Sequence, residues 1–194
     1  MIDKNEVAAF FDSYAEGWDR DLIVKQDVMD IILDAAGVTR GSAVLDVGCG
    51  TGVMIEQYLR RNAGWVTGID ISPNMAAIAR AKFPEENVEI LCADAETQDF
   101  WRQYDCAVIY NAFPHFASPD RLFSHLASFL KPGGTLTVAH NMSRAQIDSH
   151  HSGVQHVSNG LMEAEELAGL MASYVTITRV ISDDNMYLVS GRKG

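Results

Sequence analysis

The stretch from residue 44 to residue 52 reads Val44-Leu45-Asp46-Val47-Gly48-Cys49-Gly50-Thr51-Gly52. Its apolar run predicts a buried strand, and the three alternating glycines predict a sharp turn that a ligand can approach without meeting a Cβ atom. The spacing differs from the Gly-x-Gly-x-x-Gly of dinucleotide-binding folds, which direct a helix dipole at a pyrophosphate. An acid two residues before the first glycine favours a cationic ligand, so we expect Asp46 to hold an ammonium group or a loop amide. A tight turn that needs glycine only for its backbone is the alternative.

Short apolar runs alternate with helical segments after this stretch. Strands are expected at residues 43–47, 65–70, 88–92, 104–110 and 135–140, and helices at residues 53–61, 73–82 and 119–130. This alternation predicts parallel βαβ units with helices on both faces of the sheet. Near-continuous apolar strands agree with a sheet that is buried on both sides.

The carboxyl-terminal part of the sequence has a different pattern. A short helix is expected at residues 142–151, a loop at 152–160 and a helix at 163–172. Two further strands, at 174–181 and 186–190, flank a turn cluster and predict an antiparallel hairpin. The expected fold is therefore a Rossmann-like, doubly wound α/β domain whose seven-stranded sheet has five parallel strands plus this C-terminal antiparallel hairpin.

Composition excludes several classes of function. The 194 residues, 47% hydrophobic and 21% charged, predict a single globular domain. A net charge of −11 argues against duplex nucleic acid and anionic membranes as partners. No run reaches 18 apolar residues, the first ten residues do not form a signal peptide, and three cysteines without CxxC spacing indicate a reducing compartment. We therefore expect a cytoplasmic protein, as a monomer or a homodimer.

Two more acids follow predicted strands at regular spacing. Asp70 lies 24 residues after Asp46, and an acid there can accept hydrogen bonds from both hydroxyls of a ribose. Its alternative role is a helix cap, although Ser72 before Pro73 is the better candidate. Asp94 lies another 24 residues on and can accept from an adenine amino group, or it is a solvated turn residue.

Two stretches resemble motifs of class I S-adenosylmethionine-dependent methyltransferases. One is the glycine turn, and the other is Leu130-Lys131-Pro132-Gly133-Gly134-Thr135-Leu136, which resembles the turn that this family places before its fifth strand. The resemblance extends over residues 43–140. It implies S-adenosyl-L-methionine as cofactor, S-adenosyl-L-homocysteine as product and a small-molecule acceptor. Its nearest subgroup is the small-molecule one that includes quinone-ring C-methyltransferases.

Roles for individual residues follow from this resemblance. The methionine part of the cofactor would be surrounded by Asp46, Gly48, Cys49 and Gly50. The ribose and adenine would be bound by Asp70, Ile71, Met75, Asp94 and Ala95. Asn111, after the fourth strand, would lie near the methyl group.

Histidines supply the candidate base. His115 follows the fourth strand, where an acceptor would lie, and its ordinary pKa suits a proton acceptor near neutral pH. A packing or capping role is the alternative. The other candidates, as bases or metal ligands, are His140, His150, His151 and His156. Their spacing matches no zinc signature, so we expect a polar loop and no metal.

The amino-terminal segment has two compatible interpretations. Residues 6–37 have helical spacing of apolar residues and end at Gly37. Their aromatic stripe includes Tyr14 and Trp18, one of which we expect to contact a ligand. Residues 1–40 would form a helical lid, as in similar enzymes, or a helix packed on the sheet. Residues 41–194 would form the Rossmann-like core of the same single domain.

These observations predict methyl transfer to a small molecule by in-line displacement. The negative field favours a neutral or cationic acceptor, although a local pocket can override net charge. An RNA or protein methyltransferase is one alternative, but the segment after the fourth strand lacks the Asp/Asn-Pro-Pro-Tyr sequence of amino-methylating DNA enzymes. A non-catalytic S-adenosylmethionine-binding subunit is the other alternative, because fold alone does not imply activity.

Overall fold

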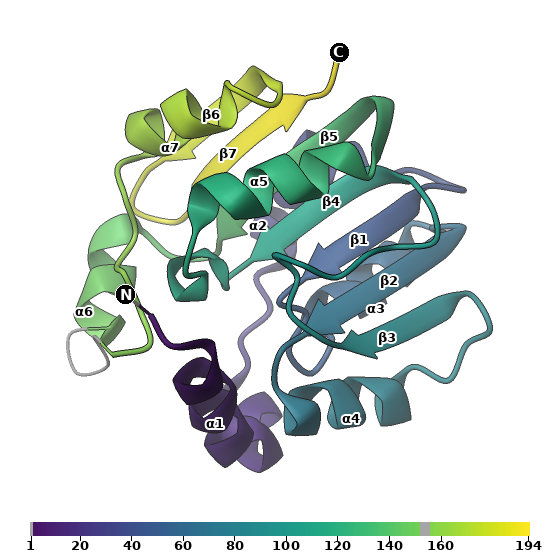
Figure 1. Cartoon of the computed structure of the whole chain (residues 1–194), viewed down its shortest axis with the longest axis vertical. Coiled ribbons are helices and arrows are strands. Elements are labelled where there is room, and N and C mark those ends of the chain that lie inside the picture. Colours follow the sequence, from purple (N-terminus) through teal and green to yellow (C-terminus); the bar gives the residue numbers. More distant parts are fainter. Residues whose placement is uncertain (1, 152–155) are drawn as a thin grey trace.

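In the computed structural model, which describes residues 2–151 and 156–194, seven strands form one sheet in the order β3-β2-β1-β4-β5-β7-β6 (Figure 1). The strands are β1 (Ala43–Val47), β2 (Trp65–Asp70), β3 (Val88–Cys92), β4 (Tyr104–Tyr110), β5 (Leu130–His140), β6 (Thr176–Ser182) and β7 (Tyr187–Arg192). The first five are parallel, and β7 lies antiparallel between β5 and β6. The predicted fold class is therefore confirmed.

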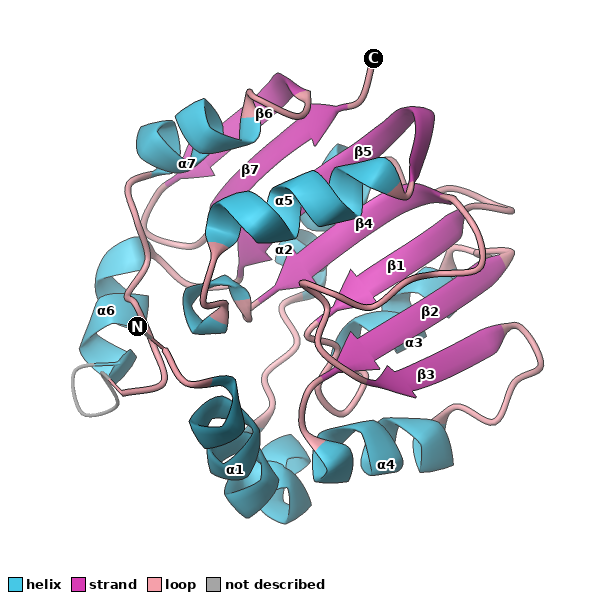
Figure 2. Cartoon of the chain, in the orientation of Figure 1, coloured by secondary structure: helices cyan, strands magenta, loops and turns pink. Residues whose placement is uncertain are grey.

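Helices cover both faces of this sheet (Figure 2). They are α1 (Lys4–Tyr14), α2 (Gln26–Ala35), α3 (Val53–Arg60), α4 (Pro73–Lys82), α5 (Pro119–Ser128), α6 (Arg144–His151) and α7 (Ala164–Met171), with 3₁₀ helices η1 (Ala15–Asp21) and η2 (Phe113–His115). Side chains of α5, α6 and α7 form one core, and those of α2, α3 and α4 form the core on the opposite face. The central strand β1 contributes Leu45 to the first core and Val44 to the second, since neighbouring strand residues point to opposite faces.

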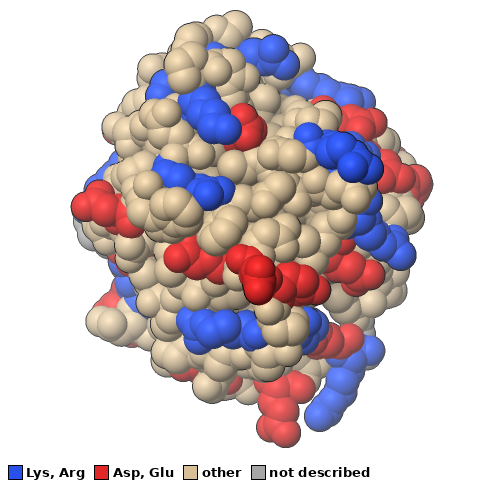
Figure 3. Space-filling view, turned by 90° about the vertical axis from the view of Figure 1, so that its right-hand side faces the viewer, with Lys and Arg blue, Asp and Glu red and all other residues tan. Residues whose placement is uncertain are grey.

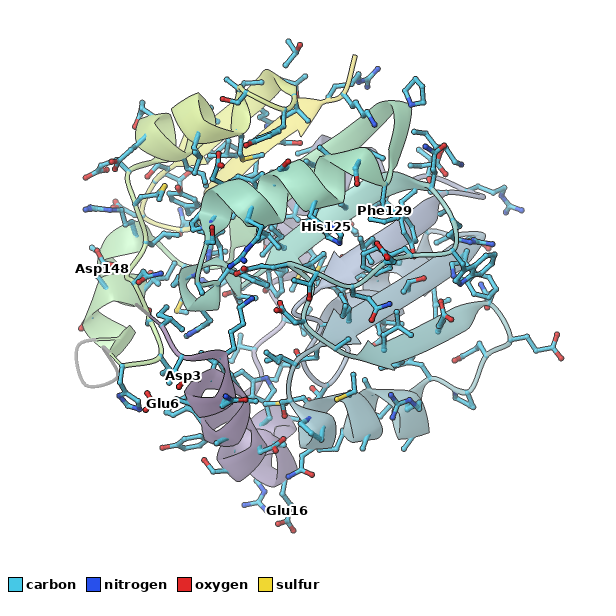
Figure 4. The ribbon with its side chains drawn as sticks, in the orientation of Figure 1. Asp3, Glu6, Glu16, His125, Phe129 and Asp148 are labelled. Atoms are coloured by element: carbon cyan, nitrogen blue, oxygen red, sulfur yellow. The ribbon has the colours of Figure 1, made fainter. Side chains whose placement is uncertain are left out.

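Local capping explains where two of the helices begin. The Ser72 hydroxyl accepts a hydrogen bond from the amide of Met75 at 3.1 Å, and Pro73 follows it, as the sequence predicts for the start of α4. Asp3, labelled in Figure 4, accepts from the amide of Asn5 at 2.8 Å and begins α1. Ser118 occupies the cap position of α5, but its hydroxyl makes no capping bond.

The expectation of one helix over residues 6–37 is wrong. Helix α1 ends at Tyr14, η1 continues to Asp21, and α2 begins only at Gln26. Leu22 and Lys25 have extended backbone angles, with ψ values of 113° and 98°. The break brings Leu22 and Ile23 to a cavity, which helical spacing alone does not reveal. Part of the loop expected at 152–160 lies outside the described residues.

None of the helices in the described part of the chain has the length and apolar character that a membrane span requires.

Candidate functional site

A cavity of about 610 Å³ lies at the carboxyl ends of the parallel strands. Residues at the ends of β1, β2 and β4 and after β3 form its floor, and residues of α1, η1 and the segment 22–25 form its cover. Figure 1 shows α1 beside this edge of the sheet and near α4. Open α/β sheets bind ligands at this edge, and the volume is in the range of small-molecule sites.

Nearly all of the predicted site residues line this cavity. They are Trp18, Asp46, Gly48, Cys49, Gly50, Asp70, Ile71, Met75, Asp94, Ala95, Asn111 and His115. Tyr14 does not line it: its side chain is 55% exposed and its ring lies 4.9 Å from that of Phe10. Contact of each of these residues with a ligand stays a prediction.

The glycine turn lies tightly against its neighbours. The amides of Gly48 and Cys49 both donate to the carbonyl of Ile69, at 2.8 and 3.1 Å, which joins the turn to the end of β2. Gly48 has a φ of +70°, and a Cβ atom there would lie 2.6 Å from the Cβ of Ala112. Glycine is therefore required at this position both for the backbone conformation and for the close approach.

Asp70 connects the turn to the start of α4. Its Oδ2 accepts from the amide of Gly50 at 2.8 Å, and its Oδ1 accepts from the amide of Ser72 at 2.9 Å. Burial raises the pKa of Asp70, and the two backbone hydrogen bonds act in the opposite direction. Each carboxylate oxygen can accept a further hydrogen bond. Asp70 therefore fixes a loop amide of the glycine turn, whereas its contact with a ribose stays a prediction.

Asp46 is buried at the end of β1 and has an incomplete set of partners. Its Oδ1 accepts from the Tyr58 hydroxyl at 3.2 Å, whereas its Oδ2 has no hydrogen-bond partner among the described residues. Burial, and then the charge of Asp70, raises the pKa of Asp46 to about 7. A buried carboxylate that borders a cavity with an unused acceptor atom suits a cationic group of a ligand.

Sequence reasoning missed Lys4 and Glu96. The Lys4 ammonium lies 2.5 Å from Asp94 Oδ2 and 2.9 Å from Glu96 Oε2. Glu96, whose side chain is fully buried, also pairs with Arg121 at 3.0 Å. Burial acts to lower the pKa of Lys4, but its hydrogen bonds to the two carboxylates raise that pKa above its usual value. These contacts join residues about ninety positions apart, so no local sequence pattern predicts them.

Two aspartates attach the amino-terminal segment to the cavity wall. Asp12 accepts a hydrogen bond from the Ser72 hydroxyl at the start of α4. Asp19 accepts from the Thr51 hydroxyl in the glycine turn at 2.6 Å. The predicted lid segment is therefore held against the turn and α4 by polar contacts rather than by an apolar stripe alone.

The ends of β4 and β5 are linked by a reciprocal pair of hydrogen bonds. The Asn111 side-chain amide donates to the Asn141 Oδ1 at 3.0 Å, and the Asn141 backbone amide donates to the Asn111 Oδ1 at 3.2 Å. Asn111 has a φ of +52°, a conformation that asparagine tolerates better than most residues. Both residues line the cavity at the ends of β4 and β5, on the other side of β1 from the ends of β2 and β3 where Asp70 and Asp94 lie.

His115 lies on the same side of the cavity. Its Nδ1 is 2.7 Å from the Val157 carbonyl oxygen, which can only accept, so Nδ1 carries a proton and the lone pair of a neutral ring is on Nε2. Its ring meets that of Phe11 edge-on at 4.9 Å. This tautomer is compatible with the predicted role as a proton acceptor.

The other candidate histidines are dispersed. His140 is buried with its ring 6.0 Å from that of Tyr187, and His156 is exposed near Phe10. The side chains of His150 and His151 lie outside the described part. Among described residues, no group of three or more His, Cys, Asp or Glu side chains is placed to hold a metal ion.

Comparison with known proteins finds similarity to methyltransferases. Residues 44–134 match the family model described as a methyltransferase domain. The chain is 33% identical over 142 residues to malonyl-[acyl-carrier protein] O-methyltransferase of Acetivibrio thermocellus, covering 70% of this chain and 49% of that protein. It is 31% identical over 144 residues to ubiquinone biosynthesis O-methyltransferase of Coxiella burnetii, covering 70% and 61%.

A solved structure shows the same fold over nearly the whole chain. The methyltransferase in complex with the Haloferax volcanii Trm112 methyltransferase activator has a TM-score of 0.81 at 21% identity, covering 96% of this chain and 97% of that one. These matches support the class I S-adenosylmethionine-dependent methyltransferase family that the glycine turn resembles. The chain spans between about half and three fifths of the length of these two curated relatives.

Proposed function

We propose that the chain transfers a methyl group from S-adenosylmethionine to a small-molecule acceptor. The observation that carries this proposal is the buried Asp46 carboxylate beside the glycine turn, whose Oδ2 has no hydrogen-bond partner among the described residues. The cofactor supplies an electrophilic methyl group on a positively charged sulfur. Asp46 would bind the ammonium group of its methionine part, next to Gly48, Cys49 and Gly50.

The opposite part of the cavity suits the nucleoside. Asp70 would accept from the ribose hydroxyls while it retains its two amide donors. Ile71 and Met75 would present apolar surface to an adenine ring, and Ala95 also lines the cavity. Asp94 would accept from the adenine amino group with the oxygen lone pairs that Lys4 leaves unused.

The remaining part of the cavity would hold the acceptor. Methyl transfer requires the acceptor to be aligned with the methyl–sulfur bond in a site without bulk water. Asn111 would lie near the methyl group, and His115 Nε2 would receive a proton from an oxygen, nitrogen or carbon acceptor. Residues 1–40 would form the lid that excludes water, as part of a single domain with residues 41–194, and Trp18 would contact the ligand.

The two alternative functions have less support. An RNA methyltransferase needs clustered cations, whereas the face in Figure 3 has Lys and Arg interspersed with Asp and Glu. A non-catalytic binder needs no acceptor space, whereas the cavity continues past Asn111 to Met142 and Gln146. The Haloferax volcanii neighbour was solved with an activator protein, so we propose a protein partner as the alternative to the expected monomer or homodimer.

The test is calorimetric titration of the purified protein with S-adenosylhomocysteine, with NADH as a control. We expect micromolar binding of the first compound and no binding of the second. Binding of NADH, or no binding of S-adenosylhomocysteine, would contradict the proposal.

Asp70→Ala should weaken binding of S-adenosylhomocysteine by about 1–3 kcal/mol, the usual cost of removing one partner of a buried polar group. The loss arises because the ribose hydroxyls and the Gly50 amide both lose an acceptor. Calorimetry measures it, with Asp105→Ala at the opposite end of the sheet as the control. Unchanged affinity would remove Asp70 from the site.

The lid proposal predicts slower hydrogen exchange in the amino-terminal segment. When S-adenosylhomocysteine is added, amides of α1 should exchange at least about tenfold more slowly, because local opening of the lid then requires loss of ligand contacts. Amides of α7, at the far end of the sheet, serve as the control. Equal rates in α1 with and without ligand would show that this segment does not cover the site.

A further inference from the structure

Two lysines line the cavity, and only one of them is neutralised. Lys4 is paired with Asp94 and Glu96. Lys25 has no carboxylate within salt-bridge distance in the part of the chain that the structure describes. Its ammonium donates to the Asn141 backbone carbonyl at 3.2 Å, next to the linked ends of β4 and β5. A positive charge without an acidic partner among the described side chains therefore lies on the proposed acceptor side of the cavity.

Exposed apolar side chains are concentrated beside this lysine. Of the seven large apolar side chains exposed among the described residues, five fall within residues 14–24. Three of them line the cavity, namely Trp18, Leu22 and Ile23, which are 41%, 39% and 72% exposed. Exposed apolar side chains that cluster next to a cavity are typical of a ligand-binding surface.

The apolar surface continues from the mouth of the cavity to the candidate base. The ring of Trp18 lies 5.7 Å from that of Phe11, and the ring of Phe11 lies 4.9 Å from that of His115. Ile23 and Lys25 are two residues apart in an extended segment, a spacing that places their side chains on one side of the chain. A charged group and an apolar chain can therefore be bound next to each other.

We infer that the acceptor is an amphipathic acid whose carboxylate binds Lys25 and whose aliphatic part lies on Trp18, Leu22 and Ile23. This inference rests on the proposed function and names its substrate class. It departs from the neutral or cationic acceptor that the net charge of −11 favours, because a single unpaired cation at short range outweighs a diffuse field that salt screens.

The test uses the S-adenosylhomocysteine-saturated protein and decanoate as the probe, below its micelle concentration. By calorimetry, decanoate should bind at least tenfold more tightly than decanol or decyltrimethylammonium. Lys25→Met should remove this preference and leave the affinity for S-adenosylhomocysteine unchanged, and Lys25→Arg should retain it. Lys131→Met, which alters a lysine at the opposite end of the sheet, is the matched control.

The apolar part is tested with a chain-length series. From octanoate to decanoate, affinity should rise by up to about fourfold for each methylene group that becomes buried. Ile23→Ser should reduce that rise, whereas Val180→Ser, at an exposed apolar residue on β6 away from the cavity, should leave it intact.

Each failure has a distinct meaning. If S-adenosylhomocysteine binds but decanoate shows no preference over decanol, the inference is wrong and the proposed function stands. An equal loss in Lys131→Met would show a general charge effect and would also overturn the inference. If S-adenosylhomocysteine does not bind, the proposed function fails and the inference fails with it.

Discussion

Asp46→Asn is expected to weaken binding of S-adenosylhomocysteine about ten- to a hundredfold near pH 8, the range for a lost charge-assisted hydrogen bond. The carboxylate at this position is buried, and its Oδ2 has no partner among the described residues. The ligand ammonium would supply that partner. Asparagine keeps the size of the side chain but lacks the charge, so the loss measures the electrostatic contribution.

The same residue should make ligand binding depend on pH. Burial raises the pKa of Asp46 to about 7, and the ammonium binds only the ionised carboxylate. As the pH falls below about 7, the affinity of the wild-type protein should therefore decrease, towards tenfold per pH unit. Asp46→Asn should show no such dependence. Binding below pH 7 should also release a proton, which calorimetry in buffers of different ionisation enthalpy detects.

The pH dependence of stability should have the opposite sign to the pH dependence of binding. Because the folded pKa of Asp46 is above its ordinary value of 3.8, the folded state binds more protons than the unfolded state between about pH 4 and pH 7. The free energy of unfolding of the ligand-free protein should therefore fall as pH rises through that window. Asp46→Asn should lack this decrease and should be the more stable protein near pH 8, as urea denaturation can measure.

Asp105→Asn is the control for the binding experiment, since Asp105 pairs with Lys131 at the other end of β4. It should leave the affinity and its pH dependence unchanged. Wild-type affinity that stays constant from pH 6 to pH 8, or that increases on acidification, would exclude an ammonium contact at Asp46.

Local sequence features predicted the sheet and much of the cavity lining. The strand bounds expected for 43–47, 65–70, 88–92 and 104–110 agree with the structure. A short apolar run between turn residues is too short for a helix and is typical of a buried strand. Asp46 and Asp70 each end a predicted strand, which placed both of them at the carboxyl edge, since parallel strands end on one side.

The cover of the cavity could not be predicted in this way. Leu22 and Ile23 continue a helical apolar pattern, and no glycine or proline lies between Leu22 and Gln26 to mark the break there. Lys4 and Asp12 act through partners far away in the sequence, and surface helices carry many such charges. Such long-range polar contacts are determined by tertiary packing and not by spacing.

Gly48→Ala is expected to reduce the free energy of unfolding by about 3 kcal/mol. A left-handed backbone costs a residue with a side chain about 1–2 kcal/mol, and overpacking adds about 1–3 kcal/mol. Both costs apply here, because Gly48 has a φ of +70° and its added Cβ would lie 2.6 Å from that of Ala112. The end of β4 would have to move away from the turn.

Gly133→Ala separates these two contributions. Gly133 has a φ of +77°, but nothing lies within 4 Å of an added Cβ, so this variant has only the backbone cost of about 1–2 kcal/mol. Urea denaturation of both variants and the wild type gives the difference, which is the cost of the contact with Ala112. Gly48→Ala should also weaken binding of S-adenosylhomocysteine at least about tenfold, since a displaced turn misplaces Asp46, whereas Gly133→Ala should bind normally. Equal destabilisation by the two variants would mean that the glycine is required only for its backbone conformation, which is the purely structural interpretation of the turn.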